Sequence, residues 1–396
     1  MPGTELFGPE EKKEVMDVLE SGILFRYNHD DLRNGHWKAK EFEQELAKFN
    51  KVKYAHAVSS GSTAVSTALA AVGVGAGDEV IVPPFTYIAT VEAVLMAGAL
   101  PVFAEIDETL CLSPEGIKAA ITPKTKAVAL VHMCGAMAKL DEIIEVCNEH
   151  NIILVEDTAQ ALGGSFKGNA LGSYGKVGCF SFDFFKIITA GEGGAIITND
   201  EQVYNNAHAY ADHGHDHIGD NRGAEQHPIL GFNFRISELH AAVGLAQVRK
   251  IEQILVKQKA NKKAIKDSLA KFDEITFRHL PDEDGDSATF LSFFLPTEDK
   301  ARKVAAALGK AGLGGAYWYD NNFHYIKNWE HLKEMKTCAK LPIEVLGTPQ
   351  DYAKIEFPKS DDIVSRLISL QVRVTWTEEE LKQYCEKLET VLKETL

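Results

Sequence analysis

The sequence predicts an α/β fold in which a large domain with a mostly parallel central sheet is followed by a smaller C-terminal α/β domain. Three observations lead to this prediction. Short apolar runs alternate with helical stretches between about residues 55 and 200, a long amphipathic stretch follows Arg235, and a further apolar run begins at Phe290. Strands that are covered on both faces have nearly continuous apolar sequences, and parallel strands need a crossover between them. The length of 396 residues is enough for about two or three domains.

Two helices are expected before the sheet. A proline near its first turn opens a helix around Pro9–Glu20, and a second helix is expected around Lys38–Phe49. The residues between them, 23–37, read as a long loop. The sequence therefore predicts three parts: an N-terminal helix and loop over 1–37, a large domain over 38–255 and a small C-terminal domain over 256–396.

Six apolar runs supply the expected strands of the large domain. Between them lie stretches with helical spacing, such as residues 91–99 and 139–150. This alternation is typical of βαβ units. The six runs are residues 78–85, 98–106, 126–133, 151–157, 177–182 and 193–198.

The C-terminal part begins with a change of pattern. The amphipathic stretch 236–272 predicts one or two helices that lead out of the large domain. The turn-rich residues 281–287 mark a boundary, and the apolar run 290–296 opens the small domain. The chain ends in a further amphipathic stretch at 378–394.

The composition is that of a soluble globular protein, with 45% hydrophobic and 25% charged residues. The net charge of −15 opposes binding to phosphodiester backbones, so we expect no nucleic-acid partner. No apolar stretch approaches the roughly 20 residues that cross a bilayer, and no signal peptide is recognisable, so we expect a cytoplasmic protein without a membrane partner. The six cysteines form no CxxC pair and are expected to be single buried thiols rather than a disulfide framework or zinc site.

A candidate anion site lies at Ser60-Gly61-Ser62, immediately before an amphipathic helix. The first backbone N–H groups of a helix have no partner within it, and together with the positive end of the helix dipole they attract anions. Serine is also a preferred N-cap for backbone reasons alone. The sequence therefore leaves two interpretations open here, an anion site and a plain cap.

Two further motifs combine polar residues with apolar strands. Residues 151–157 end in Glu156 and Asp157, which places Asp157 at the carboxyl end of the sheet, where open α/β folds bind ligands. The same acidic pair is equally compatible with a structural ion pair or a helix cap. Lys186 lies between an apolar strand and a glycine-rich turn. Burial there would lower its pKa and make the amine nucleophilic, as Schiff-base chemistry requires, whereas most lysines between strands are solvated.

In combination these motifs resemble those of the DegT/DnrJ/StrS sugar aminotransferases, fold-type-I enzymes that depend on pyridoxal 5′-phosphate (PLP). The resemblance extends over most of residues 40–250, in the family's order. It implies a fold like that of aspartate aminotransferase, with the PLP site in the large domain. It includes the segments AVSSGSTAVSTALAAVGVGAGDEVIVPPFTYIAT, LVEDTAQALGGSFKG, FSFDFFKIITAGEGGAIITND and GFNFRISELHAAVGLAQV.

The resemblance implies a role for each residue of the site. Lys186 would carry the cofactor as a Schiff base and move the proton during transamination, and Asp157 would keep the pyridine nitrogen protonated. Gln160 would contact the 3-oxygen of the ring, and Tyr87 would stack on the ring. Asn233 would reach the phosphate from the neighbouring subunit, so a homodimer with shared active sites is expected. The remaining phosphate contacts would come from Ser60, Gly61, Ser62 and Ser181.

Two positions depart from the family pattern. The family usually has Ser-Gly-Thr where this chain has Ser60-Gly61-Ser62, and serine keeps the hydroxyl group. Asp183, Phe184 and Phe185 stand before Lys186, where a His-Pro-x-Lys run or similar is common, so the wall beside the lysine is expected to differ. Related 4-keto-sugar 3-dehydratases have histidine in place of the lysine, and Lys186 argues against that activity.

Candidate substrate contacts come from the N-terminal loop and a histidine-rich segment. His213, His215 and His217 alternate and could bind a metal, but zinc sites usually have thiolates or ligands fixed at a distance. We expect no metal in this segment. Instead, we expect the segment, including His215, to donate hydrogen bonds to a hydroxylated anionic substrate.

An acidic chain that binds a sugar acid also needs local cations, and arginine matches a carboxylate best. The candidate arginines are Arg26, Arg222 and Arg235. Each of them could instead form a structural ion pair or be solvated.

The predicted activity is transfer of an amino group from L-glutamate to a keto or aldehyde sugar. Four segments look most like those of the 8-amino-3,8-dideoxy-manno-octulosonate aminotransferases, which act at C8 of a Kdo-type sugar acid for lipopolysaccharide. They are residues 25–37, 131–135, 316–329 and the histidine-rich segment 212–219. The expected substrate is then 3,8-dideoxy-8-oxo-manno-octulosonate, and the alternative is a nucleotide-linked 4-keto-6-deoxyhexose. Outside this class, a cofactor-holding regulatory protein or a zinc-dependent protein is the alternative.

Overall fold

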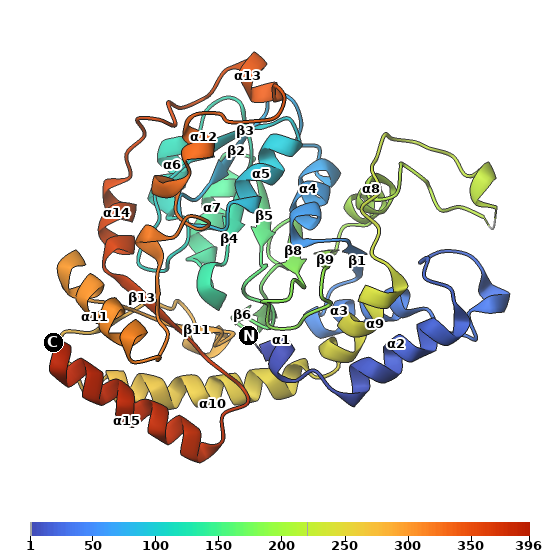
Figure 1. Ribbon diagram of the computed structural model, residues 1–396. Helices are drawn as coiled ribbons and strands as arrows, with labels where there is room; N and C mark the ends of the chain where they lie inside the picture. The colour runs from blue at the N-terminus through green and yellow to red at the C-terminus, as the bar shows by residue number, and fades with distance from the viewer. Residues whose placement is uncertain (1, 220) are drawn as a thin grey trace.

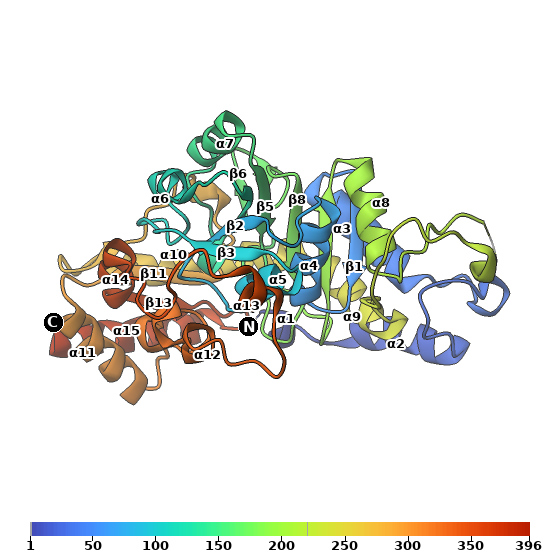
Figure 2. The ribbon, with the colours of Figure 1, turned by 90° about the horizontal axis from the view of Figure 1, so that it is seen from above.

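The computed structural model describes residues 2–219 and 221–396 and contains a seven-stranded sheet and a smaller four-stranded sheet (Figure 1, Figure 2). The strand order of the large sheet is β1-β9-β8-β5-β4-β2-β3. Its strands are β1 (Tyr54–Val58), β2 (Glu79–Val82), β3 (Leu100–Phe103), β4 (Thr125–Val131), β5 (Ile153–Asp157), β8 (Val177–Ser181) and β9 (Gly194–Thr198).

The large sheet is mostly parallel, as the sequence predicts. β3, β2, β4, β5 and β8 run parallel to one another, and β9 runs antiparallel to both β8 and β1. The chain reverses between β8 and β9 through the loop 182–193, without a helical crossover. Each of the six predicted apolar runs forms a strand. β1 is not predicted, because its short run YAHAV is interrupted by His56.

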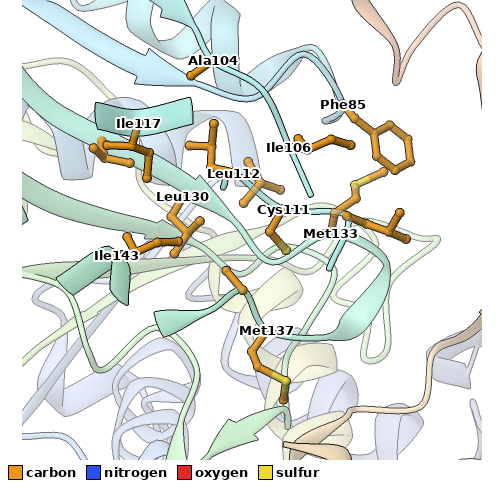
Figure 3. Packing of buried hydrophobic residues seen from close by; sticks show 14 of the residues in the cluster. Phe85, Ala104, Ile106, Cys111, Leu112, Ile117, Leu130, Met133, Met137 and Ile143 are labelled. Carbon is orange, nitrogen blue, oxygen red and sulfur yellow. The ribbon is translucent and has the colours of Figure 1, made fainter. Parts of the chain in front are cut away.

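Successive residues of the strands enter two different cores on the two faces of the large sheet. In β2, for example, Val80 belongs to one core and Ile81 to the other, as the alternation of side chains in a strand requires. Figure 3 shows part of the core around Ile81, where Ile117 and Ile143 of two helices lie near Leu130 of β4. The helices over this face are α6 (Pro114–Ala120) and α7 (Leu140–Glu149), and those over the other face are α4 (Gly61–Ala71), α5 (Ala89–Met96) and α8 (Glu201–Tyr210).

The N-terminal helices cover the β1 edge of the sheet. α3 (Lys38–Asn50) packs against β1 and against α9 (Glu238–Val248), and α2 (Pro9–Ser21) packs on α9. Both helices expected before the sheet are therefore present. The predicted loop 23–37 contains a single 3-10 turn at Asp30–Leu32.

The small sheet is antiparallel, with the order β10-β11-β13-β12. α10, α11 and α15 contribute apolar residues to its core, and Figure 1 shows α10 and α15 side by side along the bottom of the molecule. The elements are β10 (Thr276–Phe277), β11 (Phe290–Phe294), β12 (Ala316–Tyr317), β13 (Leu367–Gln371), α10 (Ile251–Leu269), α11 (Glu298–Lys310) and α15 (Glu378–Thr395).

One part of the C-terminal chain packs on the large sheet instead. Trp329, Ile343 and Tyr352 belong to the same core as Phe103 of β3, and the Tyr352 hydroxyl donates to the carbonyl of Pro101. The boundary expected after residue 255 lies inside α10. The division into 1–37, 38–255 and 256–396 stays a prediction. The remaining helices and strands are α1 (Pro2–Glu5), α12 (Glu330–Lys333), α13 (Pro342–Leu346), α14 (Pro358–Ser365), β6 (Ser165–Phe166) and β7 (Asn169–Ala170).

The structure bears on two expectations from the composition, namely that the cysteines are buried thiols and that no segment crosses a membrane. All six cysteines are free; five are buried and Cys338 is exposed, which corrects the expectation of uniformly buried thiols. Cys338 lies in a segment with few buried residues, so a thiol there meets water. Within the described residues, no helix has both the length and the apolar character needed to cross a membrane.

Candidate active site

A cavity of about 570 Å³ lies at the carboxyl ends of β4, β5 and β8. Parallel strands bring these ends to one edge of the sheet, so Val131, Asp157 and Ser181 all line it. The residues predicted from the sequence that line this cavity are Ser60, Gly61, Ser62, Tyr87, Asp157, Gln160, Ser181 and Lys186.

Lys186 occupies the loop between β8 and β9. Burial lowers the pKa of its ammonium group, against the opposing influence of Asp157 and Asp183, so the neutral amine forms more readily than on an exposed lysine. Its Nζ atom lies 6.0 Å from the centroid of the Tyr87 ring. Asp183 shapes the loop: its carbonyl accepts the Lys186 N–H at 3.1 Å, and its Oδ1 accepts the Phe185 N–H at 2.9 Å. The two phenylalanines before the lysine are exposed, and Phe185 lines the rim of the cavity.

Asp157 and Glu156 face different environments. Asp157 is buried and lines the cavity, where its Oδ2 accepts the Thr90 hydroxyl at 2.7 Å and its Oδ1 accepts the Ala159 N–H at 3.1 Å. Glu156 is fully buried and accepts a hydrogen bond from His132 Nε2 at 2.8 Å and three from backbone N–H groups of residues 172–175. Of the two interpretations of this acidic pair, the structural one describes Glu156 and the ligand-binding one describes Asp157.

The start of α4 forms a cradle for an anion. Ser60 is the N-cap, and its Oγ accepts the Thr63 N–H at 3.1 Å, so both interpretations of this motif apply together. Gly61 and Ser62 provide the first amides of the helix, which have no carbonyl partner within it. Ser181 lies directly against Gly61, since a Cβ atom at Gly61 would be 2.6 Å from Ser181 Cβ and 2.8 Å from its Oγ. The two amides and this hydroxyl group suit a phosphate.

Replacing Gly61 with alanine is expected to weaken PLP binding by on the order of tenfold, about the free energy of one hydrogen bond to a charged group. The added methyl group must displace either Ser181 or the start of α4. Titration of the apoprotein with PLP, followed by absorbance, measures the dissociation constant. Gly75→Ala is the matched control, because nothing lies within 4 Å of a Cβ atom there. An unchanged affinity in Gly61→Ala would show that the phosphate binds elsewhere.

Gln160 is oriented by an unusual backbone segment. Its Oε1 accepts the Cys134 N–H at 3.0 Å, which leaves the amide NH₂ group as the donor for a ligand oxygen. Cys134 has a φ of +54°, in the left-handed region that is costly for residues other than glycine. The buried Arg278 guanidinium donates to the carbonyls of Met133 and Ala136 and so holds this segment in place.

Several residues that line the cavity are not among the predicted site residues, although two of them, Trp318 and His324, lie in the segment 316–329 that the sequence analysis singled out. Thr289, Phe290, Trp318 and His324 lie far along the chain from the other lining residues, and they reach the cavity only because the C-terminal part folds back. His324 Nδ1 is 2.9 Å from Asn321 Oδ1 and therefore donates to it, which leaves Nε2 as an acceptor. Burial lowers the pKa of His324 to about 4, with a smaller contribution from Lys186, so the imidazole is neutral at pH 7. Thr86 and Thr90 also line the cavity.

The predicted substrate contacts lie outside the lining of this cavity. Arg26 is buried and donates to Glu43 at 2.6 Å, and His215 pairs with Glu225 at 2.8 Å. Arg222 donates to Asp212 at 2.7 Å, and Arg235 pairs with the same oxygen of Asp212. We expected these segments to converge on the active site, but within this chain they converge on each other, and nearby carboxylates of this acidic protein already pair with all three arginines. No group of three or more His, Cys, Asp or Glu among the described residues is arranged to hold a metal ion.

Asn233 is exposed and is not among the residues lining the cavity of its own chain. It lies opposite Asp212 in an isolated antiparallel bridge. Three neighbouring apolar side chains are also exposed, namely Ile229, Leu230 and Phe232, and Leu230 retains 94% of its accessible surface.

Comparison with known proteins gives matches over most of the chain. Residues 7–389 match the DegT/DnrJ/EryC1/StrS aminotransferase family. The chain is 38% identical over 247 residues to GDP-perosamine synthase of Vibrio cholerae, a match that covers 62% of this chain and 64% of the relative, less than two thirds of the latter. It is 30% identical over 402 residues to the spore coat polysaccharide biosynthesis protein SpsC of Bacillus subtilis, covering 98% of this chain and 96% of the relative.

A solved structure is similar over nearly its whole length. The aminotransferase from Psychrobacter cryohalolentis has a TM-score of 0.85 at 28% sequence identity, and the match covers 98% of both chains. This similarity confirms the α/β fold class that the sequence predicts, a large domain with a mostly parallel sheet and a smaller α/β unit.

Proposed function

Because the chain belongs to the DegT/DnrJ/EryC1/StrS aminotransferase family, we propose that it transfers an amino group from L-glutamate to a nucleotide-linked keto sugar. The observation that carries this proposal is the meeting of Lys186 and Asp157 in one cavity, beside a helix N-terminus suited to a phosphate. Pyridoxal 5′-phosphate is the cofactor, as the sequence predicts.

The residues of the cavity fit this cofactor. The amides of Gly61 and Ser62 would hold the phosphate, together with the Ser181 hydroxyl group, which lies beside them because Gly61 has no side chain. Asp157 presents a buried carboxylate for the ring nitrogen, and Gln160 presents its NH₂ group for the 3-oxygen. When bound, PLP supplies an electron sink that stabilises negative charge at the carbon that loses its proton.

The protein's own contribution is to hold the cofactor and to move a proton. Lys186 holds the cofactor through Nζ, and its lowered pKa favours the neutral amine that this bond requires. Once the amino donor has displaced it, Lys186 accepts and returns the proton at Nζ. Asp157 would keep the ring nitrogen protonated, and Tyr87, whose ring centroid lies 6.0 Å from Lys186 Nζ, would cover the ring.

The relatives support the nucleotide-linked substrate over the octulosonate. GDP-perosamine synthase is named for a nucleotide-linked amino sugar. A sugar acid and a nucleotide diphosphate are both anionic, so the pairing of all three candidate arginines with carboxylates inside this chain favours neither substrate. Among the described residues that line the cavity, Lys186 is the sole cationic side chain, and Asp183 and Glu192 are acidic.

A two-substrate assay tests the proposal. With L-glutamate as donor, kcat/KM for a nucleotide-linked 4-keto-6-deoxyhexose is expected to exceed that for 3,8-dideoxy-8-oxo-manno-octulosonate by roughly 100-fold or more, as expected where polar contacts to the missing nucleotide are lost. Mass spectrometry of the two amino sugars, formed in competition, measures the ratio. The free 4-keto-6-deoxyhexose is the matched control for the nucleotide. A preference for the octulosonate would overturn the nucleotide-sugar assignment and restore the sugar acid as the substrate.

We propose in addition that the working unit is a homodimer. Asn233 is exposed and does not line the cavity of its own chain, and the exposed Ile229, Leu230 and Phe232 near it form an apolar surface that favours contact with another copy. Such a contact would bring Asn233 to the phosphate of the neighbouring subunit. Leu230→Ser, compared with wild type by analytical ultracentrifugation, is expected to shift the equilibrium towards the monomer.

A further inference from the structure

The buried carboxylate of Asp157, at the end of β5, accepts a hydrogen bond from a hydroxyl group on helix α5. Asp157 retains 5% of its accessible surface and Thr90 retains 1%. The Thr90 Oγ1 atom lies 2.7 Å from Asp157 Oδ2, while the Ala159 N–H donates to Oδ1. Thr90 lies in the first turn of α5, and it reaches Asp157 across 67 positions of sequence.

A second hydroxyl group supports the first. Thr86 Oγ1 lies 2.9 Å from Thr90 Oγ1, and Thr86 is fully buried. A hydroxyl group has one proton to donate, and the ionised carboxylate can only accept, so the Thr90 proton goes to Asp157. Thr86 is therefore the donor between the two threonines. Its one proton also has the Tyr87 carbonyl within reach at 3.2 Å, and the contact with Thr90 is the shorter of the two. The resulting chain runs from Thr86 through Thr90 to Asp157, and each bond polarises the next.

The backbone fixes the position of this pair. The Thr86 N–H donates to the carbonyl of His324 at 3.0 Å, and the Ile88 N–H donates to the carbonyl of Phe323 at 2.9 Å. The Thr90 N–H donates to the carbonyl of Tyr87 at 3.2 Å, which starts the helical turn. The C-terminal segment that folds back over the cavity therefore also anchors the loop that carries the two hydroxyl groups.

We propose that Thr90 is a positioning residue for the reaction: its hydroxyl group keeps the Asp157 carboxylate ionised and aimed at the ring nitrogen of the cofactor, with Thr86 in support. The inference rests on the proposed function. A hydrogen bond to Oδ2 from Thr90 and one to Oδ1 from Ala159 prevent rotation of the carboxylate and leave its remaining lone pairs for the ring nitrogen. Without the Thr90 donor, a buried negative charge loses one of its two protein donors, and the positive charge on the ring is held less firmly.

Thr90→Val tests the proposal, because valine has nearly the shape of threonine but no hydroxyl group. The dissociation constant of PLP is expected to rise about tenfold, and the pH midpoint of the absorbance change of the bound cofactor is expected to move upward by about one unit, because a weaker positive charge on the ring raises the pKa of the nitrogen joined to Lys186. The other titratable groups around this site, Lys186, Asp183, His324 and Cys179, are unchanged in the variant, so a shift is assigned to Asp157.

Two further variants separate this role from a packing role. Thr90→Ser keeps the hydroxyl group. Its dissociation constant for PLP is expected to stay within about twofold of wild type, and the pH midpoint of the absorbance change within about 0.3 pH units. Thr86→Val removes only the supporting donor. It is expected to raise the dissociation constant of PLP and the pH midpoint by less than Thr90→Val does. If the valine variant does not fold, Thr90→Ala takes its place in the same comparison.

The possible results distinguish a positioning role of Thr90 from a packing role, and both from a failure of the proposed function. Wild-type affinity and midpoint in folded Thr90→Val would overturn the positioning role while leaving the proposed function intact. Equal losses in Thr90→Val and Thr90→Ser would also overturn it, because packing rather than the hydroxyl group would then be responsible. A wild-type protein that binds no PLP would overturn the proposed function itself, and this inference with it.

Discussion

Replacing Lys186 with alanine is expected to reduce transamination by at least about 10⁴-fold while the chain stays folded. The variant loses both the amine that holds the cofactor and the group that moves the proton. The side chain lines a cavity rather than a packed core, so its removal leaves the three hydrophobic cores around the large sheet intact. Stopped-flow absorbance with L-glutamate measures the first half-reaction, and thermal unfolding monitors the fold.

Lys176→Ala is the matched control for this experiment. Lys176 lies ten positions earlier in the sequence and pairs at the surface with Asp200, at 2.5 Å, so its loss is expected to leave turnover within about twofold of wild type. Steady-state turnover with glutamate in the Lys186→Ala variant would remove Lys186 from its assigned role.

Replacing Asp157 with asparagine is expected to weaken PLP binding by about 10- to 100-fold and to slow both half-reactions by on the order of 10²-fold. A neutral amide cannot stabilise a protonated ring nitrogen, and the ring then draws electrons less strongly from the reacting carbon. The amide NH₂ group replaces one of the two carboxylate oxygens, so it faces either the Thr90 hydroxyl group or the Ala159 N–H, each of which donates to the native carboxylate. The dissociation constant, the absorption spectrum and the two single-turnover rates report these effects.

The neighbouring position offers a control of the same chemistry. Glu156→Gln makes the same change one residue away, where the carboxylate accepts hydrogen bonds from His132 and three backbone amides and is not part of the cavity lining. We expect it to lower the free energy of unfolding by on the order of 3 kcal/mol, because it breaks a buried charged network, and to leave the spectrum of bound PLP unchanged. If the Asp157 variant has a wild-type spectrum and wild-type rates, Asp157 is not the partner of the ring nitrogen.

Much of the cofactor site can be predicted from the sequence because it is built from local motifs. The anion cradle at Ser60-Gly61-Ser62 is a property of one helix start, and Asp157 ends a strand whose apolar run is recognisable by itself. Lys186 lies in a short loop between two such strands. Parallel strands must bring their carboxyl ends together, so the predicted order of strands and helices already places these motifs at one edge of the sheet.

Tertiary structure alone decided what depends on contacts between distant segments. The sequence places Asp157 at the ligand edge of the sheet, but it does not show that Glu156 is held by His132 and by the backbone of residues 172–175. The sequence proposes Arg26, Arg222 and Arg235 as substrate contacts, and the fold pairs Arg26 with Glu43 and both Arg222 and Arg235 with Asp212. A charged side chain pairs with whatever the fold brings within a few ångströms, and sequence spacing does not encode that distance.

The same reason explains the residues that the sequence analysis did not find. Thr90 donates to a carboxylate 67 positions away, and His324 reaches the cavity because the chain returns from the small sheet to cover the large one. Both residues lie in segments that the sequence analysis singled out, PFTYIAT and residues 316–329, but the sequence shows nothing of which distant groups they contact. The backbone chemistry of the cofactor site was therefore determined by the sequence through local hydrogen-bonding geometry, whereas the surroundings of Asp157 and the paired state of the arginines were decided by packing between segments that meet only in the folded chain.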